Sequence, residues 1–265
     1  MTRRDPHEPV PVQRTIDGGS SEPSPGSSAE PAPEAPPASS AHLSPERFRN
    51  PRRRLARRIA QRVFLQGLAY RTIRRTVVTH PAAEALDGAC IVVANHSSHL
   101  DAPLVLGSVP RRICRDLATG VAADYFFTAP HKRMFTELIF NAFPVDRTGT
   151  GANRGLSKQL LKAGVPLLIF PEGTRSRTGK MGSFKIGAAG LAKAVGVPVV
   201  PVALIGAYEA MPRGTRWPRR GRPRVVVAVG EPLVAREKEP TSSFNDRIEA
   251  SVRALYAEHR PRIGA

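Results

Sequence analysis

Short apolar runs alternate with longer, more mixed segments through the middle of this 265-residue chain. Residues 91–94, 166–170 and 199–205 are almost continuous stretches of Val, Ile, Leu and Ala. Such runs are typical of strands that are buried on both faces, as in a parallel sheet. Between two of them, residues 153–163 place leucines at helical spacing and predict a crossover helix. The alternation predicts a single α/β domain over residues 80–260, with a largely parallel central sheet flanked by helices.

The apolar run at 199–205 contains Pro201 and directly follows Pro198. Proline lacks the backbone N–H that a central strand donates to its neighbour. We therefore expect this strand to lie toward the edge of the sheet.

The first 44 residues have a different composition, with many Pro, Ser, Ala, Gly and Glu and few large apolar side chains. Such a segment buries too little surface to offset the conformational entropy that is lost on folding. Residues 1–44 are therefore predicted to be a disordered tail. They also lack the basic-then-apolar order of a signal peptide.

Residues 45–79 form a basic segment in which arginines alternate with regularly spaced apolar residues. Leu55, Ile59 and Val63 recur every fourth residue, which predicts an amphipathic helix with an arginine face. Three interpretations remain open: a helix in the headgroup plane of an anionic membrane, a nucleic-acid contact, and a solvated face packed on the domain. The first is favoured because aliphatic and aromatic residues share the segment with the arginines.

No stretch reaches the roughly 18–20 apolar residues that a spanning helix needs. We therefore expect a peripheral protein on the cytoplasmic face of the membrane, with nucleic acid an unlikely partner. The formal net charge of +18 favours acidic partners in general. Cys90 and Cys114 are too few for a disulfide framework or a zinc site. The sequence also has no phosphate-binding glycine loop of the Walker or dinucleotide type.

The clearest candidate chemistry follows the run at 91–94, in the sequence N-H-S-S-H-L-D at 95–101. On a regular helix, His96 and Asp101 would point roughly 140° apart, so their cooperation requires a strand-to-helix turn. An imidazole held by a carboxylate is the base half of a nucleophilic triad, and a hydroxyl of the substrate can serve as the nucleophile. Open alternatives are Ser97 or Ser98 as nucleophile, a metal site that adds His99, and a helix cap with polar loop residues.

A second polar turn, F-P-E-G-T-R-S at 170–176, follows the run at 166–170. It offers Arg175 and backbone N–H groups to an anion. Together, residues 95–101 and 170–176 match the N-H-x-S-x-x-D and F-P-E-G-T-R-S signatures of the glycerolipid acyltransferases typified by 1-acylglycerol-3-phosphate acyltransferase. Residues 143–147 and 197–202 resemble the second and fourth blocks of that family, in the same order.

The resemblance implies an O-acyltransferase of phospholipid biosynthesis. Such an enzyme moves a fatty acyl group from acyl-CoA or acyl carrier protein to the hydroxyl of 1-acyl-glycerol-3-phosphate and forms phosphatidic acid. His96 and Asp101 would be catalytic. The residues implied to position the acceptor are Arg147, Glu172, Gly173, Thr174 and Arg175, with the two arginines on its phosphate. No metal or cofactor is expected, because a thiolate leaves readily and the attacking alcohol obtains its base from the protein.

Two alternative functions remain open. The first keeps the chemistry and changes the acceptor to another lysolipid or lipid alcohol. The second is a non-catalytic basic protein that binds membranes or nucleic acid through its arginine-rich segment. Acyl transfer that depends on an added alcohol would separate the enzyme from the binding protein.

Overall fold

The computed structural model describes residues 44–63, 65, 70–122, 130–145, 155–215 and 217–264. The chain divides into two units, residues 1–38 and 39–265, and every described residue belongs to the second. The predicted tail therefore lies outside the described residues apart from Ser44.

The core of the described unit is a sheet of seven strands in the order β1-β7-β6-β2-β5-β3-β4. The strands are β1 (Arg74–Thr79), β2 (Ile91–Ala94), β3 (Ala118–Ala122), β4 (Phe143–Val145), β5 (Leu167–Ile169), β6 (Val199–Ile205) and β7 (Arg224–Val229). All neighbouring pairs are parallel except β6 and β7, which are antiparallel. The predicted α/β class with a largely parallel central sheet is confirmed.

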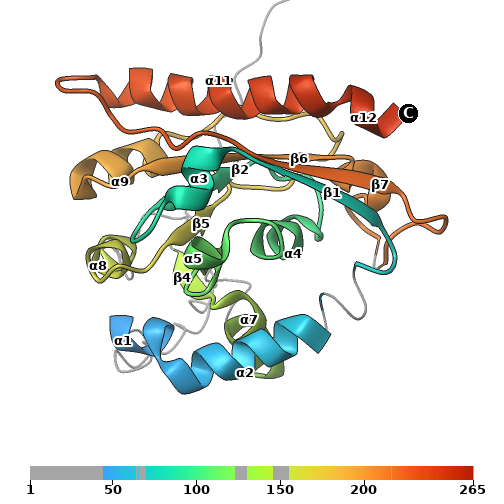
Figure 1. Ribbon diagram of the computed structural model, residues 1–265, viewed down its shortest axis with the longest axis horizontal. Helices are drawn as coiled ribbons and strands as arrows, with labels where there is room; N and C mark the ends of the chain where they lie inside the picture. The colour runs from blue at the N-terminus through green and yellow to red at the C-terminus, as the bar shows by residue number, and fades with distance from the viewer. Residues whose placement is uncertain are drawn as a thin grey trace, which may run out of the picture. The chain divides into compact units, whose positions relative to one another are not determined.

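Helices cover both faces of this sheet (Figure 1). One face carries α8 (Leu156–Lys162), α9 (Gly187–Val195) and α11 (Thr241–His259). The other carries α4 (Asp101–Leu106) and α5 (Arg111–Cys114), with α1 (Pro45–Arg49), α2 (Pro51–Gln61) and α7 (Pro130–Phe140) beyond them. The remaining short helices are α3 (Pro81–Ala85), α10 (Ala207–Ala210) and α12 (Pro261–Gly264).

Alternate residues of each strand face opposite sides of the sheet and build two hydrophobic cores. In β2, Val92 and Ala94 join the core under α4, whereas Ile91 and Val93 join the core under α9 and α11. All four side chains are fully buried. A strand that is apolar at every position is therefore explained by burial on both faces.

The predicted edge position of β6 is wrong, because β6 lies between β7 and β2. The carbonyl of Pro201 accepts a hydrogen bond from Gly230 N at 2.8 Å. The peptide groups of Pro201 therefore face the β7 side, just beyond the last ladder pair, Val202 and Val229. The missing N–H removes no bond to β2, so proline is tolerated in an interior strand.

The predicted helical segment at 45–79 also needs correction at its end, because Arg74–Thr79 form strand β1 at the edge of the sheet. The β-branched residues of this strand pair in parallel with β7, and that pairing outweighs the arginine pattern. The helical part itself is broken at Asn50, whose side chain accepts hydrogen bonds from Arg52 N and Arg53 N and caps α2. Within the described part of the chain, no helix combines the length and the apolarity that crossing a membrane requires.

Candidate active site

The turn after β2 brings His96 and Asp101 into direct contact. His96 Nδ1 lies 2.8 Å from Asp101 Oδ2. Asp101 is fully buried, whereas 21% of the His96 side chain is exposed. The two residues lie in a strand-to-helix turn, as predicted from the sequence. The angular separation that they would have on a regular helix therefore does not apply.

Backbone groups hold the Asp101 carboxylate in place. Its Oδ2 also accepts hydrogen bonds from Ser97 N at 2.6 Å and Ser98 N at 2.7 Å. Hydrogen bonds from N–H groups stabilise the ionised form of a carboxylate. With the carboxylate on Nδ1, the imidazole keeps its proton on that nitrogen, and Nε2 is left as the basic position.

Asn95 fastens the beginning of the turn to the neighbouring strand β6. Its side chain accepts a hydrogen bond from Leu204 N at 2.7 Å and donates one to Leu204 O at 2.9 Å. These two hydrogen bonds fix the position, relative to β6, at which the chain leaves β2. This bridging role of Asn95 was not predicted from the sequence, where its place directly after a buried strand was the available signal.

The second turn, after β5, lies against the first because β2 and β5 are parallel neighbours. Glu172 Oε1 accepts a hydrogen bond from His96 N at 2.6 Å, and Ser176 N donates to His96 O at 2.8 Å. Glu172 Oε2 accepts a further bond from Gly182 N at 2.8 Å. Both carboxylate oxygens therefore bind backbone, and Glu172 links the two turns.

The ring of Phe170 stacks on the His96 imidazole, with 4.1 Å between centroids and 17° between planes. Together with Asp101, this contact restricts the imidazole to one orientation. In the sequence, Phe170 was only part of the matching signature, and its contact with His96 was not predicted.

Gly173 has a φ of +76°, a conformation that favours glycine. A Cβ atom at this position would lie 2.9 Å from Lys185 Nζ. The Lys185 side chain therefore lies directly against Gly173 and adds a positive charge to the turn that carries Arg175. Thr174 in this turn is exposed, and Gly173 and Arg175 are partly exposed. A partly exposed turn with cationic neighbours is a suitable place for a phosphate.

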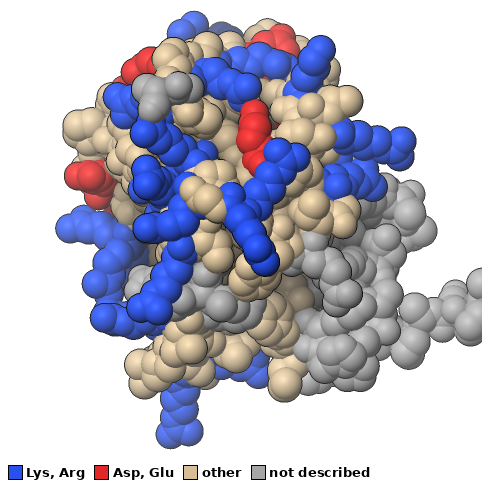
Figure 2. Space-filling model, turned by 90° about the vertical axis from the view of Figure 1, so that its right-hand side faces the viewer, with Lys and Arg blue, Asp and Glu red and all other residues tan. Residues whose placement is uncertain are grey.

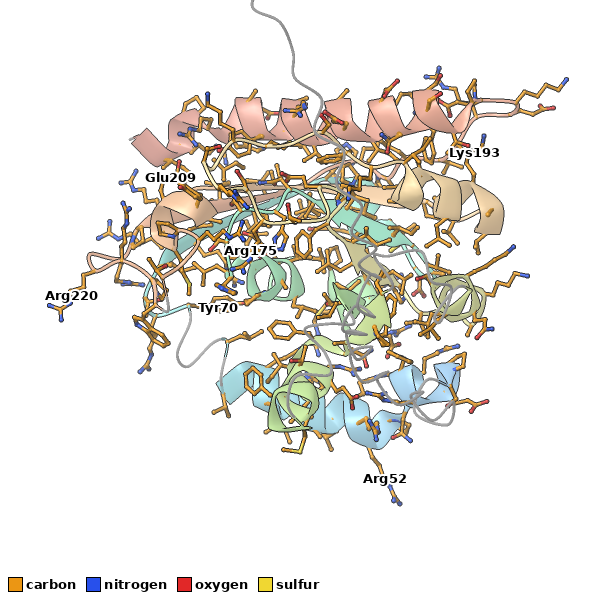
Figure 3. The ribbon with its side chains drawn as sticks, turned by 180° about the vertical axis from the view of Figure 1, so that it is seen from behind. Arg52, Tyr70, Arg175, Lys193, Glu209 and Arg220 are labelled. Carbon is orange, nitrogen blue, oxygen red and sulfur yellow. The ribbon has the colours of Figure 1, made fainter. Side chains whose placement is uncertain are left out.

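Further positive charges gather at this edge of the sheet. Figure 2 views the side where β6 runs into α10, and Lys and Arg side chains crowd this face. In Figure 3, Arg175 lies nearer the centre of the molecule, whereas Arg220 projects outward from the same side. Strand β4 ends at Val145 at the same edge, but the predicted site residue Arg147 lies outside the described residues.

Two side chains at the site, Glu172 and His99, have shifted pKa values. Burial raises the pKa of Glu172, although hydrogen bonds from His96 N and Gly182 N oppose the shift. Desolvation and then the positive charge of Arg175 lower the pKa of His99. Both effects favour the neutral form of His99.

The structure also bears on two alternatives raised by the sequence, a serine nucleophile and a metal site. The Ser98 hydroxyl donates to Met211 O at 2.8 Å and accepts from Leu100 N at 3.1 Å, so its bonds are structural. Across the described ranges, no group of three His, Cys, Asp or Glu side chains is placed to hold a metal ion. The pairing of His96 with His99 and Asp101 as metal ligands therefore finds no support.

Comparisons with known proteins agree with this geometry. A family model described as Acyltransferase matches residues 55–205. A 1-acyl-sn-glycerol-3-phosphate acyltransferase of Brassica napus is 35% identical over 134 residues, which cover 49% of this chain and 36% of that protein. A 1-acyl-sn-glycerol-3-phosphate acyltransferase of Cocos nucifera is 27% identical over 191 residues, which cover 69% of this chain and 58% of that protein.

A solved structure extends the likeness to the fold. The crystal structure of the 1-acyl-sn-glycerophosphate acyltransferase PlsC from Thermotoga maritima matches 82% of this chain and 88% of its own, with 27% identity and a TM-score of 0.61. The curated relatives above are matched over about one third to three fifths of their length. The family model, however, covers more than half of this chain and includes both turns of the site. The chain therefore belongs to the acyltransferase family, as its motifs predicted.

Proposed function

We propose that the protein moves a fatty acyl group from an acyl thioester, acyl-CoA or acyl carrier protein, to the hydroxyl of 1-acyl-glycerol-3-phosphate and so forms phosphatidic acid. The observation that carries this proposal is the 2.8 Å contact between His96 Nδ1 and the buried Asp101 carboxylate. It leaves the other imidazole nitrogen as a base beside a cationic turn. Relatives of the chain are named as 1-acyl-sn-glycerol-3-phosphate acyltransferases.

In the proposed reaction, His96 Nε2 accepts the proton of the acceptor hydroxyl as its oxygen attacks the thioester carbonyl. Asp101 stabilises the imidazolium that forms and prevents the ring from turning. The new C–O bond replaces the C–S bond, and the imidazolium returns its proton to the departing thiolate. No metal or cofactor takes part, because the thiolate is a good leaving group and the base comes from the protein.

The turn after β5 is proposed to hold the acceptor. Arg175 contacts the phosphate, with Gly173 and Thr174 contributing the backbone of the turn, and Arg147 keeps the same proposed role. Because both oxygens of Glu172 accept backbone hydrogen bonds, we assign it to positioning the turn against His96. This refines the acceptor-binding role that the resemblance implied for Glu172.

A panel of acceptors with one acyl-CoA tests the proposed substrate. We expect fast thiol release with 1-acyl-glycerol-3-phosphate and slow release with 1-acylglycerol, which lacks the phosphate. In Arg175→Ala, the loss of a charged hydrogen bond of about 1.5–3 kcal/mol should raise KM for the phosphorylated acceptor roughly 10–100-fold. KM for acyl-CoA should change little.

Arg220→Ala is the matched control, because Arg220 projects away from the turn at the same edge (Figure 3). It should keep the wild-type KM for the acceptor. Equal rates with 1-acylglycerol and its phosphate would exclude phosphate recognition, and an unchanged KM in Arg175→Ala would remove Arg175 from this role.

We also propose peripheral attachment to an anionic membrane through α2 and α7. Leu55 and Ile59 on α2 are 59% and 57% exposed, and Val63 just beyond the helix is 68% exposed, so this apolar stripe does not pack on the domain. The neighbouring α7 exposes Met134 and Leu138 as well. Apolar residues that are exposed beside a dense arginine cluster suit the interface of an anionic bilayer.

Leu55→Glu combined with Ile59→Glu should weaken binding to vesicles that contain anionic lipid. Each substitution replaces a favourable apolar contact with a charge that anionic lipid repels, so we expect a loss of at least about tenfold. Co-sedimentation with vesicles measures the effect. Val234→Glu, which alters an exposed apolar residue outside α2 and α7, should bind as the wild type does; equal losses in both variants would contradict the assignment.

A further inference from the structure

A cavity of about 510 Å³ lies between α2 and the segment that runs from the end of α4 through α5. Helix α2 contributes its face at Arg54, Arg57, Arg58 and Gln61, and α5 contributes Arg111 and Arg112. None of the lining residues belongs to the two catalytic turns. Asp101 begins α4 and the cavity meets the other end of that helix, about 9 Å further along its axis.

Among the residues that the structure describes, seven arginines and no acidic residue line this cavity. Two of them have carboxylate partners: Arg54 binds Asp116 through two hydrogen bonds of 2.9 Å, and Arg115 lies 3.5 Å from Asp87 and 3.6 Å from Asp116. In the described part of the chain, the other five form no ion pair. They are Arg57, Arg58, Arg62, Arg111 and Arg112.

Arg57 is the least accessible of these cations, at 4% exposure. Its Nη2 donates to the carbonyl of Arg115 at 3.1 Å, which provides a hydrogen bond but no opposite charge. Burial lowers the pKa of Arg57 to about 10, so the guanidinium is still charged at pH 7. The Asp116 carboxylate partly offsets the cost of burying Arg57, although it forms its hydrogen bonds with Arg54. An anion that enters the cavity would stabilise the buried guanidinium further.

The cavity also has apolar walls. Leu65, Leu106 and Val109 line it and are nearly fully buried, and the half-buried ring of Tyr70 lies beside them. The exposed stripe of Leu55 and Ile59 on α2, with Val63 just beyond the helix, lies next to the arginine face that lines the cavity. The site therefore combines a cationic mouth with apolar surface in and beside it.

We propose that this cavity binds the phosphate of an anionic phospholipid, with the acyl chains following the apolar surface of α2. The five arginines that form no ion pair within the described residues provide the complementary charge, and guanidinium groups bind phosphate oxygens through paired hydrogen bonds. A free phosphate would use the arginines but leave the apolar walls unused, so a lipid is the better match. The site is separate from the acyl-transfer site, and its occupancy does not depend on turnover.

The test uses the full-length protein without acyl donor and a short-chain phosphatidylglycerol below its critical micelle concentration. Binding is measured by titration and by the rise in Tm. The main variant is Arg111→Gln with Arg112→Gln, because both arginines are exposed and their replacement should not affect folding. We expect its affinity for the lipid to fall about tenfold or more. Arg57→Gln should show the same loss in a second, independent position.

Arg52→Gln with Arg53→Gln is the matched control, because it removes two exposed arginines of the same helix that do not line the cavity. This variant should keep the wild-type affinity. Short-chain phosphatidylcholine and inorganic phosphate at equal concentration should bind much more weakly than phosphatidylglycerol. Unchanged affinity in Arg111→Gln/Arg112→Gln would overturn the proposal. So would equal binding of inorganic phosphate, or equally tight binding of a short oligonucleotide that displaces the lipid.

Discussion

Replacing His96 by alanine is expected to lower kcat for acyl transfer at least about 10³-fold, because the acceptor hydroxyl loses its base. The fold should survive the change. The imidazole is partly exposed, and Asp101 keeps its hydrogen bonds from Ser97 N and Ser98 N when the ring is gone. Thiol release from acyl-CoA in the presence of saturating acceptor measures the effect, and circular dichroism checks the fold.

His99→Ala is the control for this experiment. His99 is an exposed histidine three residues away, and it does not contact the Asp101 carboxylate through any hydrogen bond that the structure shows. Its replacement should leave kcat within about threefold of the wild type. A folded His96→Ala protein that retained most of its activity would show that another group removes the proton.

Asp101→Asn is expected to have the second largest effect, a fall in kcat of about 10²–10⁴-fold. A neutral amide cannot stabilise the imidazolium as the carboxylate does. Oδ2 of Asp101 accepts three hydrogen bonds, and the amide oxygen can keep that place. The new NH₂ group would then occupy the position of Oδ1, which is buried and has no hydrogen-bond partner among the described residues. That arrangement should cost about 1–3 kcal/mol of stability.

Asp116→Asn separates the expected loss of catalysis from the expected loss of stability. Asp116 is also a buried carboxylate, but its partners are Arg54 and Arg115, away from the catalytic turns. The variant should be destabilised to a similar degree in thermal unfolding while keeping most of its activity. If Asp101→Asn and Asp116→Asn lost activity in proportion to their stability alone, Asp101 would have no special role in catalysis.

The juxtaposition of the two turns was predictable because it depends on local patterns. Continuous apolar runs identified β2 and β5 as buried strands, and both are followed directly by polar residues. Parallel strands place their carboxyl ends at one edge of a sheet. The residues that follow β2 and β5 therefore had to lie near one another once the strands were neighbours.

The hydrogen bonds of the Glu172 carboxylate were not predictable from the sequence. They depend on which backbone N–H groups lack partners after the strands end. His96 N and Gly182 N are such groups, and they come from segments far apart in the sequence. The family signature implied a substrate contact for Glu172. We propose a positioning role for Glu172, because both of its carboxylate oxygens accept backbone hydrogen bonds.

The sequence pattern also could not predict which face of α2 packs on the domain. Periodicity shows that apolar and basic residues occupy different faces of a helix, but not which face meets the domain. Here Arg57 is buried and Arg54 binds Asp116, while Leu55 and Ile59 remain exposed. The deciding factors are the Asp116 carboxylate and the carbonyl of Arg115, both of which come from a distant segment.

In the proposed reaction, His96 activates the hydroxyl of the acceptor itself, and no acyl group is carried by the protein. The decisive experiment mixes the enzyme with excess acyl-CoA in the absence of acceptor and records thiol release and intact-protein mass together. We expect no stoichiometric burst of thiol and no mass increase, and rapid one-to-one formation of thiol and acylated product once 1-acyl-glycerol-3-phosphate is added. A burst of one equivalent of thiol, with an acyl group added to the protein, would show instead that a protein side chain is the nucleophile.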